Sequence, residues 1–152
     1  MQTVLCYLEQ DEQYLMLYRN KKKDDVNAGK WIGVGGKIEV GETPKQALLR
    51  EVKEETGLTL TAYRFRGVVE FCSDIAQPES MYLFTATAWD GTLTSCDEGE
   101  LRWIAKNELH RYPLWEGDAL FLEKLRLDSP PFRLHLQYQG DTLVEHTFEE
   151  YI

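Results

Sequence analysis

Three glutamates, Glu51, Glu54 and Glu55, form the pattern in the chain that points most directly to chemistry. On a helix, where successive residues turn by ~100°, these side chains fall within about 100° of one another and share one face. Hard divalent cations require clustered carboxylate oxygens, and Mg²⁺ typically takes a few carboxylates and keeps waters that a phosphate can replace. The pattern therefore indicates a Mg²⁺ site, with Mn²⁺ as a substitute ion.

A solvated acidic surface is the competing interpretation of this helix face, and it is the commoner one for an arbitrary helix. Solvated faces usually interleave charges of opposite sign, whereas this stripe does not. The stripe also adjoins the apolar residues Leu48, Leu49 and Val52 instead of lying opposite them. Arg50 lies one turn before Glu54, close enough to pair with it. These features favour a metal site.

The helix that carries the glutamates is expected to span Thr43–Thr56. Thr43 is a suitable N-cap, Pro44 suits the first turn and Gln46 completes a capping box. Gly57 is typical of the residue after a helix. We therefore expect the three carboxylates to stand on a rigid element.

The remaining elements predict a mixed sheet with two main helices, an α/β or α+β fold. A second helix is expected from about Gly117 to Leu127, and Asp90-Gly91 predicts a turn. Short apolar runs predict strands over Thr3–Leu8, Tyr14–Arg19, Tyr63–Glu70, Ser80–Trp89, Glu100–Ile104, Phe132–Tyr138 and Thr142–Phe148.

Length and charge limit the classes of protein that remain. The 152 residues predict a single domain spanning 1–152, and the net charge of −9 disfavours duplex nucleic acid or an anionic membrane as partner. The odd number of cysteines, Cys6, Cys72 and Cys96, favours a reducing, cytoplasmic location. No apolar run reaches the ~20 residues that a membrane helix needs.

The segment Gly36–Leu58 resembles the signature of the Nudix hydrolases. That signature reads Gly, five residues, Glu, seven residues, then Arg-Glu-apolar-any-Glu-Glu-any-Gly-apolar. The matching positions are Gly36, Glu42, Arg50, Glu51, Val52, Glu54, Glu55, Gly57 and Leu58. The resemblance implies an α/β/α sandwich with a mixed central sheet, and hydrolysis of a nucleoside diphosphate linked to another group.

The resemblance also implies roles for acids and bases in and near the signature. Glu51, Glu54 and Glu55 match metal ligands, to which the carbonyl of Gly36 and the carboxylate of Glu98 are added. Glu51, Glu54 and Glu98 are the candidate catalytic acids and bases, and which of them takes the proton from water stays open. A rival to Glu98 stands two positions later, at Glu100. Glu42 and Arg50 are expected to form an ion pair that supports the ligands.

Looser similarity to MutT- and MutX-type 8-oxo-dGTP diphosphatases lies outside the signature. By that similarity, Arg19, Lys37, Trp115 and Asp118 are expected to bind the substrate, and Lys21–Lys23 either share the phosphate-binding role or form solvated surface. The alternatives are core packing for Trp115 and a helix N-cap for Asp118.

Two departures from these relatives concern base selection. Some of them place Asn directly after the tryptophan that precedes the signature, where this chain has Ile32. Others have a second acid next to the residue that contacts the base, where this chain has Gly117.

The sequence therefore predicts a Mg²⁺-dependent enzyme that hydrolyses nucleoside triphosphates to monophosphate and pyrophosphate, with 8-oxo-dGTP as the expected substrate. The first alternative is a Nudix enzyme for an unmodified NTP, a dinucleoside polyphosphate or ADP-ribose. The second is a non-catalytic module that senses a nucleotide. A small nucleotide is the expected ligand in each case, and the protein is expected to be a monomer or a homodimer.

Overall fold

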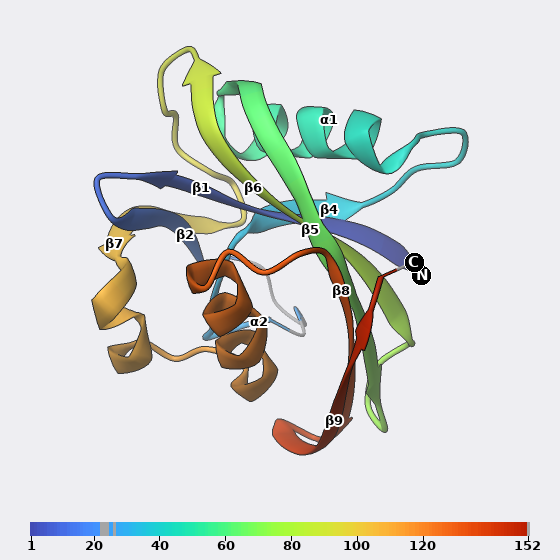
Figure 1. Cartoon of the computed structure of the whole chain (residues 1–152). Coiled ribbons are helices and arrows are strands. Elements are labelled where there is room, and N and C mark those ends of the chain that lie inside the picture. The colour runs from blue at the N-terminus through green and yellow to red at the C-terminus, as the bar shows by residue number, and fades with distance from the viewer. Residues whose placement is uncertain (22–24, 26, 152) are drawn as a thin grey trace.

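The computed structural model describes residues 1–21, 25 and 27–151, and its centre is a nine-stranded mixed sheet (Figure 1). The strands are β1 (Gln2–Gln10), β2 (Gln13–Arg19), β3 (Trp31–Ile32), β4 (Val34–Lys37), β5 (Thr59–Ser73), β6 (Glu79–Asp90), β7 (Gly99–Ala105), β8 (Phe132–Gln139) and β9 (Thr142–Glu150). Their order is β3-β2-β1-β6-β5-β8-β9, with β4 paired to β1 and β7 to β2. The pairs β1–β6 and β5–β8 are parallel, which makes the sheet mixed.

Helices cover both faces of the sheet (Figure 1). They are α1 (Pro44–Thr56) and α2 (Glu116–Arg126), with a short 3₁₀ helix η1 (Lys106–Arg111) before α2. Successive side chains of β1 point to opposite faces, so Cys6 packs in the same core as Leu48 of α1, and Tyr7 in the same core as Phe121 of α2. The expected α/β/α sandwich with two main helices is confirmed.

Local interactions set the ends of α1 close to the residues that the sequence predicts. Thr43 Oγ1 accepts a hydrogen bond from Gln46 N at 3.2 Å, while Thr43 N donates to Gln46 Oε1 at 2.9 Å. The helix ends at Gly57, whose φ of 81° is left-handed and whose N–H donates to the carbonyl of Lys53. Because Leu48 is fully buried on the sheet, the glutamate stripe faces the neighbouring strand β4.

Strand β5 is much longer than the predicted Tyr63–Glu70, since it spans fifteen residues and pairs with both β6 and β8. Its register against β6 shifts between Phe65 and Gly67, which leaves Arg66 as an extra residue in a β-bulge. The chain turns away at Gly91, as Asp90-Gly91 predicted, but no hairpin forms there, because β6 pairs with β1 and β5, and β7 with β2. Among the described residues, no helix has the length and apolar character to cross a bilayer.

Candidate active site

Two consecutive glycines bring the backbone of β4 against the acidic face of α1. A Cβ on Gly36 would lie 2.5 Å from the carboxyl carbon of Glu51, so a side chain there would collide with the carboxylate. The N–H of Gly35 donates to Glu55 Oε1 at 2.7 Å. Strand and helix can approach this closely because Gly36 carries no side chain, whereas the missing side chain of Gly35 makes room for the Val4 carbonyl of β1.

One guanidinium, that of Arg50, joins several of the acids. Its Nε lies 2.7 Å from Glu42, and its Nη1 lies 2.8 Å from Glu51 and 3.3 Å from Glu54. Its Nη2 donates to the carbonyl of Lys37 at 2.9 Å. The hydrogen bond from Arg50, with a second from the N–H of Glu39, lowers the pKa of Glu42 to about 2. The expected ion pair between Glu42 and Arg50 is therefore present.

Glu55 combines deep burial with an oxygen that lacks a partner. Burial raises the pKa of Glu55 to about 8, against the lowering effect of the Gly35 N–H, and the charges of Glu98 and Glu51 add to the rise. In the part of the chain that the structure describes, its Oε2 is buried without a hydrogen bond. An unpartnered buried oxygen is costly, and a bound cation would satisfy it.

The donor set therefore fits a hard divalent cation in its chemistry: carboxylates on one helix face, an orphaned Glu55 oxygen and a bare backbone at Gly36. Among residues 1–21, 25 and 27–151, no three acidic, histidine or cysteine side chains are gathered around one point as a finished coordination shell. Arg50 and Gly35 hold one oxygen each of Glu51 and Glu55 by hydrogen bonds. The Oε2 of Glu55, which has no partner among the described residues, could bind an ion without breaking the bond of that carboxylate to Gly35.

Glu98 belongs to the same region, because Arg19 Nη1 lies 3.0 Å from its Oε2 and its charge raises the pKa of Glu55. Glu100 pairs with Arg102 at 3.3 Å instead, so its carboxylate is not directed at the glutamates of α1. The Nε of Arg19 also contacts Asp25 at 2.7 Å.

The lysine cluster after β2 is described only at its first position. Lys21 Nζ donates to the carbonyl of Cys96 at 2.7 Å, which ties the end of β2 to the loop before β7. Lys22 and Lys23, which the sequence suggested as further phosphate contacts, lie outside the described residues.

A cavity of about 280 Å³ opens beside Gly36, and all four of the expected substrate-binding residues line it. They come from β2, β4, the approach to α2, and α2 itself: Arg19, Lys37, Trp115 and Asp118. The cavity therefore extends from the strand that faces the glutamates to the beginning of α2. A nucleotide could place its phosphates near Gly36 and its base near Asp118.

Trp115 serves both the cavity wall and the core. It is buried, and its ring meets Phe71 and Tyr138 edge-on at 5.7 and 5.3 Å. Its Nε1 donates to Asn27 Oδ1 at 2.8 Å, and Lys30 Nζ lies 5.0 Å from the ring centre. The tryptophan is therefore rigidly oriented.

Asp118 is not the N-cap of α2. That position belongs to Trp115, and Asp118 lies in the first turn, where its N–H donates to the Trp115 carbonyl. Its side chain lines the cavity at 8% exposure, and burial, with the charge of Glu79, raises its pKa to about 8 while Lys30 lowers it. The carboxyl is therefore mostly protonated at neutral pH.

Sequence reasoning missed several cavity residues, among them Asn27 in the polar loop and Glu79 at the start of β6. Glu79 Oε2 accepts from Thr3 Oγ1 at 2.6 Å, which brings a second carboxylate to the cavity that contains Asp118. No local sequence signal marks either residue, because distant segments meet here: β6 pairs in parallel with β1, and Asn27 accepts a hydrogen bond from Trp115.

Packing explains the departure at Gly117. A Cβ on Gly117 would lie 2.6 Å from Leu136 Cδ1 and 2.8 Å from the Tyr138 hydroxyl. The Gly117 N–H donates to that hydroxyl at 2.6 Å. A second acid next to Asp118 would therefore require β8 to move.

The fold and the signature identify the class of protein. A family model described as NUDIX domain matches residues 1–125, so the chain belongs to the Nudix hydrolase family, whose members generally use divalent metal ions. The crystal structure of a MutT protein from Bacillus halodurans superposes with a TM-score of 0.87 over 99% of both chains at 24% identity.

Two relatives are more than 30% identical to this chain over most of its length. The oxidized purine nucleoside triphosphate hydrolase of Danio rerio is 35% identical over 132 residues, which cover 85% of this chain and 83% of that protein. The CTP pyrophosphohydrolase of Escherichia coli is 32% identical over 127 residues, which cover 80% and 88%. The two relatives share the family but differ in the nucleotide that their names state.

Proposed function

We propose that this chain is a Mg²⁺-dependent nucleoside triphosphate pyrophosphohydrolase that converts 8-oxo-dGTP to 8-oxo-dGMP and pyrophosphate and so removes an oxidised nucleotide from the precursor pool. The observation that carries the proposal is the single cavity that joins Gly36, beside the glutamates, to the buried carboxyl of Asp118. The relative from Danio rerio, named for oxidised purine nucleotides, supports the choice of substrate.

In the hydrolytic part, Glu51, Glu54, Glu55 and Glu98, with the carbonyl of Gly36, would hold Mg²⁺. The bound ion supplies charge neutralisation and a water of lowered pKa. Arg19 and Lys37 bind the phosphate oxygens from the cavity side, while Arg50 and Glu42 keep the α1 carboxylates in position.

The reaction itself needs little covalent chemistry from the protein. Water attacks the β-phosphorus in line, the bond from that phosphorus to the oxygen bridging to the α-phosphorus breaks, and the nucleoside monophosphate leaves. One of Glu51, Glu54 and Glu98 takes the proton. Positioning and charge stabilisation supply most of the rate in such transfers.

In the recognition part, Trp115 forms one wall of the base slot and Asp118 reads the edge of the base. Oxidation at C8 of guanine turns the N7 acceptor into an N–H donor. The ionised carboxylate of Asp118, which gives up its proton when the oxidised base binds, accepts a hydrogen bond from that N–H, whereas on normal guanine it would face a lone pair. A buried polar group discriminates strongly when the wrong ligand leaves it unpaired.

The second candidate function is hydrolysis of an unmodified nucleotide such as CTP. The observation that favours it is the 32% identity to the Escherichia coli CTP pyrophosphohydrolase, together with Ile32 at the cavity where some relatives have Asn. The cavity volume of about 280 Å³ is large enough for either a purine or a pyrimidine base, so it does not decide between the two nucleotides.

The deciding experiment measures pyrophosphate release from 8-oxo-dGTP, dGTP and CTP with Mg²⁺ and compares kcat/KM. We expect the highest value for 8-oxo-dGTP. Equal values for 8-oxo-dGTP and dGTP would contradict the proposed removal of the oxidised nucleotide. A higher value for CTP would establish the second candidate. No Mg²⁺-dependent hydrolysis of any of them would favour a nucleotide-sensing module.

We further propose that residues 1–152 act as one domain in the cytoplasm, as a monomer or a homodimer, on free nucleotides. Within the described residues, Cys6, Cys72 and Cys96 are unpaired thiols, which suits a reducing compartment.

A further inference from the structure

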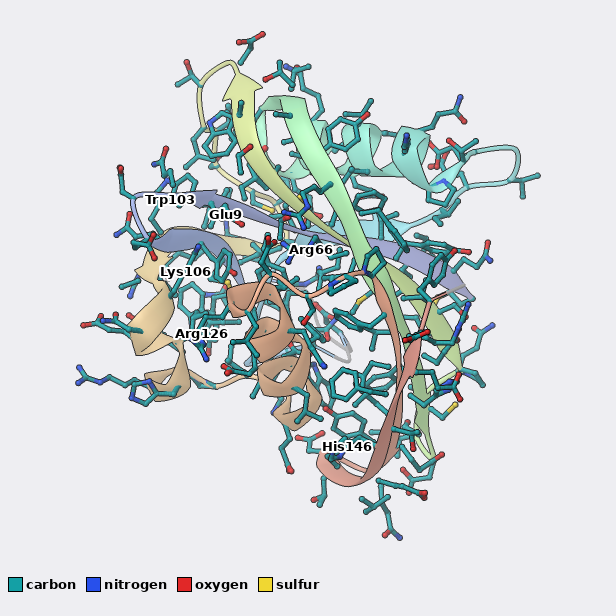
Figure 2. The ribbon with its side chains drawn as sticks, in the orientation of Figure 1. Glu9, Arg66, Trp103, Lys106, Arg126 and His146 are labelled. Carbon is teal, nitrogen blue, oxygen red and sulfur yellow. The ribbon has the colours of Figure 1, made fainter. Side chains whose placement is uncertain are left out.

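A second cavity, of about 580 Å³, lies between β5, β6, the end of β1 with the turn after it, the start of η1, and the C-terminal end of α2. Of the residues that the structure describes, none lines both this cavity and the one beside Trp115. Figure 2 shows Glu9, Arg66 and Lys106 in this region, where the hairpin of β1 and β2 meets the end of α2. Nothing in the proposed hydrolysis uses these side chains.

Arg66 is the unusual residue of this cavity because its side chain is a buried cation. It projects from the bulge in β5 and is only 4% exposed. Its Nη1 lies 3.1 Å from Thr85 Oγ1, and its Nη2 lies 3.5 Å from the Leu125 carbonyl and 3.3 Å from Asp128 Oδ1. Within the described part of the molecule, its Nε has no hydrogen-bond partner.

The counter-charge of Arg66 is weak and shared. The same Asp128 oxygen lies 2.9 Å from Arg64 Nη1, and the Asp128 side chain is 70% exposed. An exposed carboxylate stabilises a cation only weakly, because water screens its charge. Burial, with the neighbouring charge of Arg64, lowers the pKa of Arg66. The pair Arg64 and Arg66 therefore carries more positive charge than one exposed carboxylate can offset.

The other charged residues of the cavity have partners or stand at its rim. Lys106 Nζ lies 3.2 Å from Glu9, and Arg126 Nε donates to Glu123 at 2.9 Å. Glu12 is exposed in the β1–β2 turn. Counted over the lining residues that the structure describes, four cations (Arg64, Arg66, Lys106 and Arg126) face three carboxylates (Glu9, Glu12 and Asp128).

We propose that this cavity binds a small phosphate monoester, whose phosphate group contacts Arg66 and Arg64. Arginine presents planar N–H donors that match phosphate oxygens, and such charge-assisted hydrogen bonds are the strong ones. The volume falls in the range of small-molecule sites, so it has room for an organic group beyond the phosphate. The carboxylates Glu9 and Glu12 also line the cavity, and their charge favours a monoester over a more highly charged polyphosphate.

The test uses inorganic phosphate as the probe, in EDTA, so that no metal ion can hold it at the glutamates of α1. NMR titration of the whole chain gives both the affinity and the position of binding. We expect shifts in β5, β6 and the segment after α2, and affinity about tenfold lower in Arg66→Gln, because a charged hydrogen bond is lost. Arg111→Gln, an exposed arginine outside the cavity, is the matched control and should bind as the wild type.

Absence of binding by the wild type, or shifts confined to Gly36 and Trp115, would overturn the proposal. If Arg66→Gln does not fold, Arg64→Gln replaces it, because the Arg64 side chain is 55% exposed and its loss leaves the core intact. Wild-type affinity in that variant, or equal binding of acetate, would also overturn it. Hydrolysis is not measured in EDTA, so this result is independent of the proposed function.

Discussion

The glutamates of α1 and the carboxyl of Asp118 lie on either side of Gly36, and the protein holds their charges in different ways. Arg50 reaches Glu42, Glu51 and Glu54, and with the N–H of Glu39 it keeps Glu42 ionised down to about pH 2. Asp118 is buried near another carboxylate, and its pKa is raised to about 8.

The two regions also differ in how the chain builds them. The signature residues lie within 23 positions on one strand, one loop and one helix, and their contacts are set locally. The wall around Asp118 comes from β1, the loop after β2, β6 and α2. The comparison indicates that the α1 part of the metal site, though not Glu98, is positioned by local contacts, whereas recognition depends on the whole fold. The predictions below test that division.

The largest effect is expected for Glu54→Gln. Its side chain is 58% exposed, so folding should be unaffected, but a charge that helps to hold the metal is lost. We expect kcat to fall by at least about 100-fold, because such charge stabilisation is worth several kcal/mol. Steady-state kinetics with limiting Mg²⁺ measures it. Glu100→Gln is the control, and near-normal turnover of a folded Glu54→Gln would contradict the metal assignment.

A smaller effect is expected for Arg50→Ala, which removes a positioning residue and no ligand. Glu42, Glu51 and Glu54 would lose their shared partner, and we expect Mn²⁺ affinity to fall by about 10–100-fold. Isothermal titration gives the affinity. Unchanged Mn²⁺ binding would show that Arg50 has another role.

Asp118→Ala tests the recognition region alone, since it should change nucleotide selectivity and leave metal use intact. We expect the ratio of kcat/KM for 8-oxo-dGTP over dGTP to fall by about tenfold or more, and the Mg²⁺ dependence to stay the same. Kinetics on both nucleotides measures the ratio. Should the variant keep the full preference of the wild type, Asp118 has no part in recognition.

A further effect, on stability and not on activity, follows from the raised pKa of Asp118. The folded state keeps the proton up to about pH 8, whereas an unfolded aspartate loses it near ~3.9. The free energy of unfolding of the wild type should therefore decrease, relative to Asp118→Asn, as pH rises through this window, and level off above it. Urea denaturation at several pH values tests the slope. A flat difference between the two proteins would mean that Asp118 is ionised at neutral pH.

The sequence predicted best what depends on neighbours along the chain. The limits of α1 follow from Thr43, Gln46 and Gly57, and the shared face of its glutamates follows from helix periodicity. The helix pattern alone gave no reason to expect a buried Asp118, and only the resemblance to 8-oxo-dGTP diphosphatases pointed to this residue as part of a binding slot. The sequence also could not predict the hydrogen bond from Trp115 to Asn27, which joins residues 88 positions apart.

Long-range pairing also explains the errors in β5. The predicted strand Tyr63–Glu70 was too short at both ends, because pairing with β6 and β8 extends β5 from Thr59 to Ser73. The bulge at Arg66 arises from the same partners and has no local signal.

The hydrogen bond from the Gly117 N–H to the Tyr138 hydroxyl has a consequence for local unfolding. Tyr138 lies in β8, beyond the 125 residues that the family model matches, and it anchors the turn of α2 that presents Asp118. Transient opening of the β8–β9 hairpin would therefore release the base-reading helix and leave α1 folded. Amide hydrogen exchange in this hairpin should vary with nucleotide preference across variants, while turnover stays constant, so base choice can change through residues that never touch the nucleotide.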